Sequence, residues 1–243
     1  MVKFLQAKIS NTIVAIENVE LEFAFPAGKA LHPKELLGEI DGSRGTGQTS
    51  PDIAFIIRTK SGKKGIILCE NKYTEHSFYT CSARKQDKKT GREVNPDPQR
   101  CMVVADSNNC DYKSICHQTV WDRKYLNLLT FTDHARITLK RCPAATAGYQ
   151  LLRQQALAEG IAQSGRYELV VSAVAFDDRN ITLKECLKST GISDFQSEWA
   201  KLFNGQAKFL TWTHQEWIKF VREHKDGKEI DEWIEYLRER YDY

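Results

Sequence analysis

The most constraining feature of this sequence is a pair of short apolar runs separated by a tight turn. The runs are residues 53–57 (IAFII) and 66–69 (IILC), and the turn is residues 61–65 (SGKKG). Isoleucine and phenylalanine favour strands, and the small and polar residues between the runs are typical of a chain reversal. The pattern therefore predicts an antiparallel hairpin. Because the runs are continuously apolar rather than alternating, we expect both faces of the hairpin to be covered.

The rest of the chain predicts helices around that hairpin and at least one further strand. Residues 167–176 carry the strongest pattern of a buried strand, whereas residues 11–25 fit either a strand or one face of a helix. Further candidate elements are a strand at 208–212 and helices at 31–37, 144–160, 182–188, 194–203 and from 214 onward. This order predicts an α/β domain with helices on both sides of a small central sheet.

Length and composition exclude several other classes of protein. The chain has 243 residues and a 41% hydrophobic share, which is enough for one large domain and argues against disorder. Its longest apolar stretch, residues 169–176, is far shorter than the roughly 20 residues that cross a bilayer. The first residues contain no apolar run long enough for a signal sequence. We therefore expect a cytoplasmic protein without membrane contact.

The charge is unevenly distributed along the chain. The formal net charge is +3, yet residues 214–243 contain nine acidic and six basic residues and carry −3. The remaining 213 residues therefore carry +6. A basic body with an acidic tail is compatible with a polyanionic partner, although many enzymes share this distribution.

Three charged residues stand at one end of the predicted hairpin. Asp52 precedes the first strand, and Glu70 and Lys72 end the second. Side chains alternate along a strand, so Glu70 and Lys72 share one face. Pairing through the turn brings Asp52 near the level of Glu70. Two carboxylates and one ammonium group are thus expected to converge at the open end of a sheet.

Such a trio suits metal-assisted hydrolysis of a phosphodiester bond. Two carboxylates, with a main-chain carbonyl such as that of Asn71, would hold Mg²⁺ or Mn²⁺, and the metal would activate a bound water. Lys72 would orient that water or stabilise charge on the phosphorus. The alternative is a set of surface ion pairs worth about 0–1 kcal/mol each.

The same residues carry a resemblance to a known superfamily. Pro51-Asp52 followed by Glu70-Asn71-Lys72 resembles the PD-(D/E)xK signature of restriction-endonuclease-like nucleases. The runs ENKYTE (70–75) and YQLLR (149–153) resemble a group of bacterial restriction-endonuclease-like proteins. The resemblance covers about residues 11–176. It implies a restriction-endonuclease-like core, with a central mixed sheet flanked by helices.

The resemblance also implies roles for individual residues. Asp52 and Glu70 correspond to metal ligands, and Lys72 corresponds to the catalytic lysine. Gln150 and Arg153 occupy positions that often touch the site or the DNA backbone. The superfamily tends to add an acidic residue from its first helix, and the choice stays open among Glu17, Glu20 and Glu22.

Seven cysteines form the second notable feature. An odd number without a secretion signal argues against a disulfide framework. Four of them lie in a polar segment, residues 81–120, that has the composition of an insertion; they are Cys81, Cys101, Cys110 and Cys116. We expect them to bind one structural Zn²⁺, with His117 as the reserve ligand. The second alternative is that these cysteines are ordinary buried thiols without a metal. The third is a four-cysteine iron–sulfur cluster, which some relatives in the superfamily carry.

These observations lead to one preferred function and one alternative. We expect a metal-dependent DNA endonuclease, as in restriction or defence, whose core and insertion occupy residues 1–176. Residues 177–243 are expected to form a mainly helical C-terminal extension packed on that core, and the chain to act as a homodimer or within a larger DNA-processing complex. The alternative is a catalytically inactive nuclease-fold module that binds nucleic acid and is stabilised by a structural metal.

Overall fold

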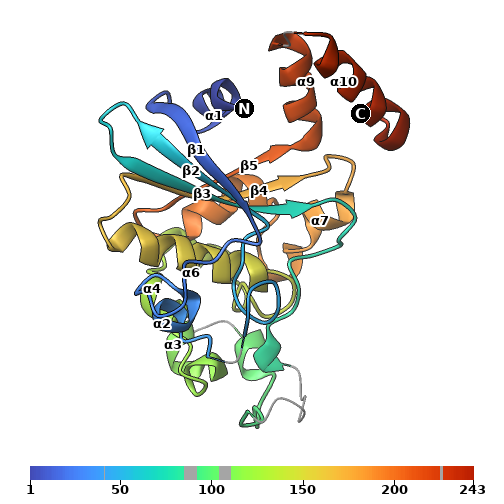
Figure 1. Ribbon diagram of the computed structural model, residues 1–243. Coiled ribbons are helices and arrows are strands. Elements are labelled where there is room, and N and C mark those ends of the chain that lie inside the picture. The colour runs from blue at the N-terminus through green and yellow to red at the C-terminus, as the bar shows by residue number, and fades with distance from the viewer. Residues whose placement is uncertain (41, 85–91, 104–110, 225–226) are drawn as a thin grey trace.

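The computed structural model has a five-stranded mixed sheet at its centre (Figure 1). It describes residues 1–40, 42–84, 92–103, 111–224 and 227–243. In spatial order the strands are β1 (Ile13–Leu21), β2 (Ile53–Thr59), β3 (Lys64–Lys72), β4 (Leu169–Phe176) and β5 (Lys208–Thr213). Strand β2 pairs antiparallel with both β1 and β3, and β4 and β5 continue the sheet in parallel with β3.

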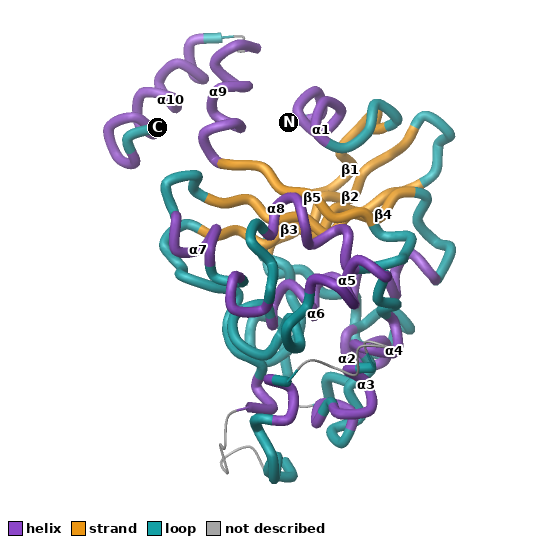
Figure 2. The backbone as a smooth tube through the Cα atoms, turned by 180° about the vertical axis from the view of Figure 1, so that it is seen from behind, coloured by secondary structure: helices purple, strands orange, loops and turns teal. Residues whose placement is uncertain are grey.

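Helices lie on both sides of the sheet. In chain order they are α1 (Val2–Lys8), α2 (Pro33–Leu37), α3 (Tyr112–Ile115), α4 (Tyr125–Leu128), α5 (Asp133–Thr138), α6 (Tyr149–Gln163), α7 (Ile181–Glu185), α8 (Phe195–Glu198), α9 (His214–His224) and α10 (Lys228–Tyr241). The long helix α6 crosses one side together with α2 to α5, while α1, α9 and α10 lie on the other (Figure 1, Figure 2). No helix in the described part of the chain is long and apolar enough to cross a membrane.

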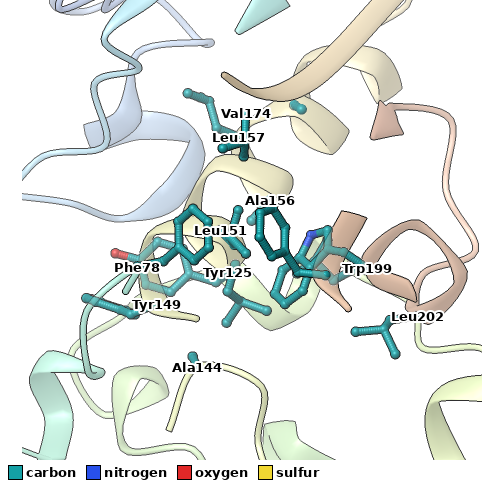
Figure 3. Close-up of a cluster of buried hydrophobic side chains, with 14 of the residues drawn as sticks. Phe78, Tyr125, Ala144, Tyr149, Leu151, Ala156, Leu157, Val174, Trp199 and Leu202 are labelled. Atoms are coloured by element: carbon teal, nitrogen blue, oxygen red, sulfur yellow. The ribbon is translucent and has the colours of Figure 1, made fainter. Parts of the chain in front are cut away.

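Two hydrophobic cores cover the two faces of the hairpin. Along β3, Ile66 and Leu68 point into the core beneath α6, whereas Ile67 and Cys69 point into the core beneath α1. The core on the α6 side contains the cluster of Figure 3, where aromatic side chains gather around Leu151 and Ala156 of α6. Every residue of β4 is buried, which explains its continuous apolar sequence.

The α/β class with a central mixed sheet flanked by helices is confirmed. The stretch that fitted either a strand or a helix forms strand β1. The helix expected over 144–160 begins only at Tyr149, where the main-chain N–H groups of Tyr149 and Gln150 donate to the carbonyls of Tyr79 and Phe78. Strand β5 lies beyond residue 176 and belongs to the same sheet. The C-terminal extension therefore contributes a strand to the central sheet in addition to its helices.

Candidate active site

The strand register places two carboxylates at one end of the hairpin. Ile53 pairs with Cys69, which puts Asp52 level with Glu70, as the sequence predicts. Asp52 Oδ2 accepts a hydrogen bond from the main-chain N–H of Asn71 at 2.6 Å. Both carboxylates line a polar pocket of about 220 Å³ that is closed by the loop before β2 and by α6. The pocket therefore gathers acidic groups from two neighbouring strand ends.

Lys72 is buried between two carboxylates. Its side chain is 3% exposed, and Nζ lies 2.9 Å from Glu70 Oε1 and 3.4 Å from Glu75 Oε1. The ammonium group also lies 5.5 Å from the centre of the Tyr79 ring. Glu75 is held in turn, because its Oε2 accepts the main-chain N–H groups of Tyr73 and Thr74. The lysine thus has a fixed position beside Glu70.

The protonation states follow from this arrangement. Burial raises the pKa of Glu70 to about 6, although Lys72 opposes the rise and Asp52 adds to it. Burial alone would lower the pKa of Lys72, but Glu70 and Glu75 outweigh it and the pKa rises. Lys72 is therefore charged at neutral pH, and Glu70 titrates closer to neutrality than an ordinary glutamate.

Of the three acidic candidates before β2, the structure brings Glu22 to the pocket. Its main-chain N–H donates to the carbonyl of Asp52 at 2.9 Å, and the residue lines the pocket with Asp52 and Glu70. Glu22 adopts a left-handed backbone conformation, with φ of 48°, at the end of β1. Glu17 instead pairs with Arg58, and Glu20 accepts from Asn18 on the outer strand. The sequence could not make this choice because it depends on where β1 ends.

Helix α6 supplies the opposite wall of the pocket. Gln154 Nε2 donates to Ser172 Oγ and to the carbonyls of Leu68 and Ala173, which fixes its side chain across β3 and β4. The side-chain oxygens Oε1 of Gln150 and Gln154 are buried, and neither has a hydrogen-bond partner among the described residues. Both glutamines line the same pocket as the carboxylates, so two residues of its wall carry a buried oxygen acceptor that lacks a partner.

Arg153 lines the pocket, but its guanidinium is committed to other protein groups. Nε lies 3.1 Å from Glu39 Oε1 and 3.0 Å from Thr49 Oγ1, and Nη2 donates to the carbonyl of Gly47 at 3.1 Å. The ring of Tyr149 packs against it at 5.2 Å. Arg153, for which the sequence predicts a DNA contact, thus lies within a network that holds the loop before Asp52.

Glu39 is the centre of that network and was not singled out by the sequence. Its side chain is fully buried and accepts from the main-chain N–H and the hydroxyl of Thr49, both at 2.6 Å, and from Tyr125 Oη at 2.7 Å. With Arg153, it joins the loop, the α4 region and α6. A glutamate in the sequence GEI carries no local pattern that signals such a position.

The candidate metal site at the cysteines is only partly described. Cys81, Cys101 and Cys116 lie in the described residues, whereas Cys110 lies outside them. His117 is buried, and its Nε2 is 3.1 Å from the carbonyl of Glu93. Within the described ranges no three His, Cys, Asp or Glu side chains are already grouped as metal ligands.

The mixed five-stranded sheet flanked by helices is consistent with a restriction-endonuclease-like fold. The chain belongs to the family described as restriction endonuclease associating with ARP, whose model matches residues 7–242. Neither a curated protein nor a solved structure matches the chain. Membership in a restriction endonuclease family indicates a nuclease-like role for the chain.

Proposed function

We propose that this protein is a metal-dependent DNA endonuclease that hydrolyses phosphodiester bonds at a PD-(D/E)xK site formed by Asp52, Glu70 and Lys72. The observation that carries the proposal is the buried Lys72 ammonium group, whose Nζ lies 2.9 Å from Glu70 Oε1. Glu70 in turn lines one pocket together with Asp52. A lysine and carboxylates held this way, in a family of restriction endonucleases, match the groups that phosphodiester hydrolysis requires.

The residues of the pocket fit a hard divalent cation. Asp52 and Glu70 would hold Mg²⁺ or Mn²⁺ with the main-chain carbonyl of Asn71, and all three ligands are oxygens. The uncompensated Oε1 atoms of Gln150 and Gln154 are suited to accept hydrogen bonds from waters of such an ion. When bound, the metal would lower the pKa of a water and neutralise phosphate charge.

The protonation state of Lys72 decides what its side chain does. Because its pKa is raised, the ammonium group stays charged and serves as a hydrogen-bond donor and a positive charge, not as a general base. Its natural role is to orient the attacking water or to stabilise the negative charge that develops on the phosphate. Glu75 maintains the lysine in that position.

The pocket also limits which groups contact the substrate. Gln150 lines the pocket, and its side-chain amide N–H is a donor suited to a phosphate oxygen, whereas Arg153 acts through the loop that it holds. We assign the enzyme to restriction or defence in the cytoplasm. The family description names association with ARP, which supports a larger complex over a homodimer.

The test is incubation of purified protein with plasmid DNA, linear duplex and single strands in Mg²⁺, Mn²⁺ or EDTA. We expect cleavage of at least one substrate with either metal and none with EDTA. A protein that binds DNA tightly but leaves every substrate intact in both metals would instead support the inactive binding module.

A further inference from the structure

Main-chain hydrogen bonds bring the cysteine-bearing segments together. The N–H of Cys142 donates to the carbonyl of Cys101 at 3.1 Å, although the two residues are far apart in sequence. The N–H of Cys81 donates to the carbonyl of Ala144 at 3.0 Å, two residues beyond Cys142. The segment before α6, which contains Cys142, is therefore bonded to the segments of both Cys101 and Cys81 and places Cys142 beside them.

Gln118 connects the fourth thiol, that of Cys116, to Cys81 in the same region. Its side-chain Nε2 donates to Cys81 Sγ at 3.2 Å, and its main-chain N–H interacts with the thiol of Cys116. We call the four thiols the thiol cluster; its members are Cys81, Cys101, Cys116 and Cys142. Cys81 and Cys142 are buried in the core on the α6 side of the sheet, and Cys101 and Cys116 are partly buried and pack against it.

Electrostatics distinguish the thiol cluster from the other described cysteines. Burial raises the pKa of all four thiols, and each of the six pairs within the cluster interacts strongly enough to raise a pKa further. Burial also raises the pKa of Cys69 and Cys186, but no other thiol contributes to either rise. Mutual proximity is therefore particular to the four.

Two arginines next to the thiol cluster are suited to thiolates. Arg84 and Arg100 each favour the charged form of Cys101, and Arg100 does so for Cys116. The buried Nε of Arg100 has no hydrogen-bond partner among the described residues. A purely apolar core would leave this N–H group without an acceptor, whereas a metal-bound sulfur can accept a hydrogen bond from it.

We propose that the thiol cluster is a structural zinc site, with Cys142 rather than Cys110 as the fourth ligand. Four thiolates and one Zn²⁺ carry a net charge of −2, which the two arginines balance. Binding releases the four thiol protons to solvent, because zinc is bound by the thiolate form. Since the sulfurs are not yet grouped around one point, their side chains must rotate inward to reach about 2.3 Å from the metal.

The position of the site explains what the zinc would stabilise. Cys81 follows closely the segment whose carbonyls, at Phe78 and Tyr79, accept the first N–H groups of α6. Tyr79 also covers the Lys72 ammonium. A zinc site here ties the chain that leaves β3 to the chain that enters α6, so both walls of the pocket depend on it.

The experiment compares Cys142→Ser with the matched variant Cys110→Ser. Full-length proteins purified without chelator are analysed for metals and sulfide, and the wild type is expected to contain about one zinc per chain. Cys110→Ser should keep that zinc, and Cys142→Ser should lose most of it. Loss in Cys110→Ser with retention in Cys142→Ser would overturn the ligand assignment, and iron with sulfide in place of zinc would overturn the metal.

A second measurement decides the question if Cys142→Ser does not fold. Zinc-edge X-ray absorption of the wild type and of Cys110→Ser should both show four sulfur ligands at about 2.3 Å. Fewer than four sulfurs in Cys110→Ser, or nitrogen or oxygen ligands in the wild type, would refute the site. Neither measurement depends on nuclease activity.

Discussion

Replacing Arg153 by alanine separates a phosphate contact from a structural role. The sequence predicts that this arginine touches DNA, whereas the structure joins it to the fully buried carboxylate of Glu39 and to the loop that precedes Asp52. Removing the guanidinium leaves Glu39 with its bonds from Thr49 and Tyr125 but without its cation. The substitution therefore leaves a buried negative charge without a counter-ion.

The magnitude follows from that burial. Breaking a buried ion pair by removing one partner costs about 3–5 kcal/mol of unfolding free energy. The matched control is Arg58→Ala, which removes an exposed pair with Glu17 and should cost about 0–1 kcal/mol. Adding Glu39→Gln to the Arg153 variant should recover part of the loss, because the stranded charge disappears.

Urea denaturation followed by circular dichroism measures the effect. With an m-value of about 3 kcal/mol per molar urea, the Arg153→Ala midpoint should fall by roughly 1–1.7 M while Arg58→Ala barely moves. A midpoint equal to wild type would refute the buried-pair argument. If DNA affinity then fell and its salt slope dropped by about 0.9, Arg153 would instead be a phosphate contact.

Three further outcomes follow from the site and its surroundings. Because the pKa of Glu70 is raised to about 6, Mg²⁺ affinity should rise with pH through that value, and Glu70's contribution to the unfolding free energy should fall as the pH rises from about 4 to 6. Titration calorimetry measures the first effect and urea melts the second, and Glu70→Gln should lack both. Glu75→Gln should slow DNA cleavage roughly tenfold at unchanged substrate affinity, since Lys72 loses a charged partner, and an unaltered rate would show that Glu75 is dispensable. Gly38→Ala should destabilise the fold by about 1–3 kcal/mol in urea, because φ is 74° and an added Cβ would lie 2.1 Å from the carbonyl oxygen of Asp122; a wild-type midpoint would contradict this.

Local pattern was sufficient for the elements that carry the candidate site. The hairpin has continuous apolar strands and a polar turn, and two-residue alternation then determines which side chains share a face with Glu70. The level of Asp52 follows from the length of the turn. These are short-range properties, so the sequence alone reveals them.

The remaining features depend on contacts between distant parts of the chain. Glu39 becomes a buried hub only because α4, α6 and the loop before β2 meet at it, and no local pattern signals this meeting. The same holds for Cys142, which lies 26 residues beyond Cys116 in sequence but beside Cys101 in space. The sequence predicts too early a start for α6, because the carbonyls that accept its first N–H groups come from the segment after β3.

The most direct test of the central claim is the single-turnover rate of DNA cleavage in Mg²⁺ by wild type, Asp52→Ala and Lys72→Ala. Lys64→Ala, at the exposed start of the same strand, is the matched lysine control. The account predicts that both site variants lose at least about a hundredfold in rate while their circular dichroism is unchanged, and that Lys64→Ala cleaves like wild type. Near-wild-type cleavage by a folded Lys72→Ala or Asp52→Ala would show that the chemistry is carried out elsewhere.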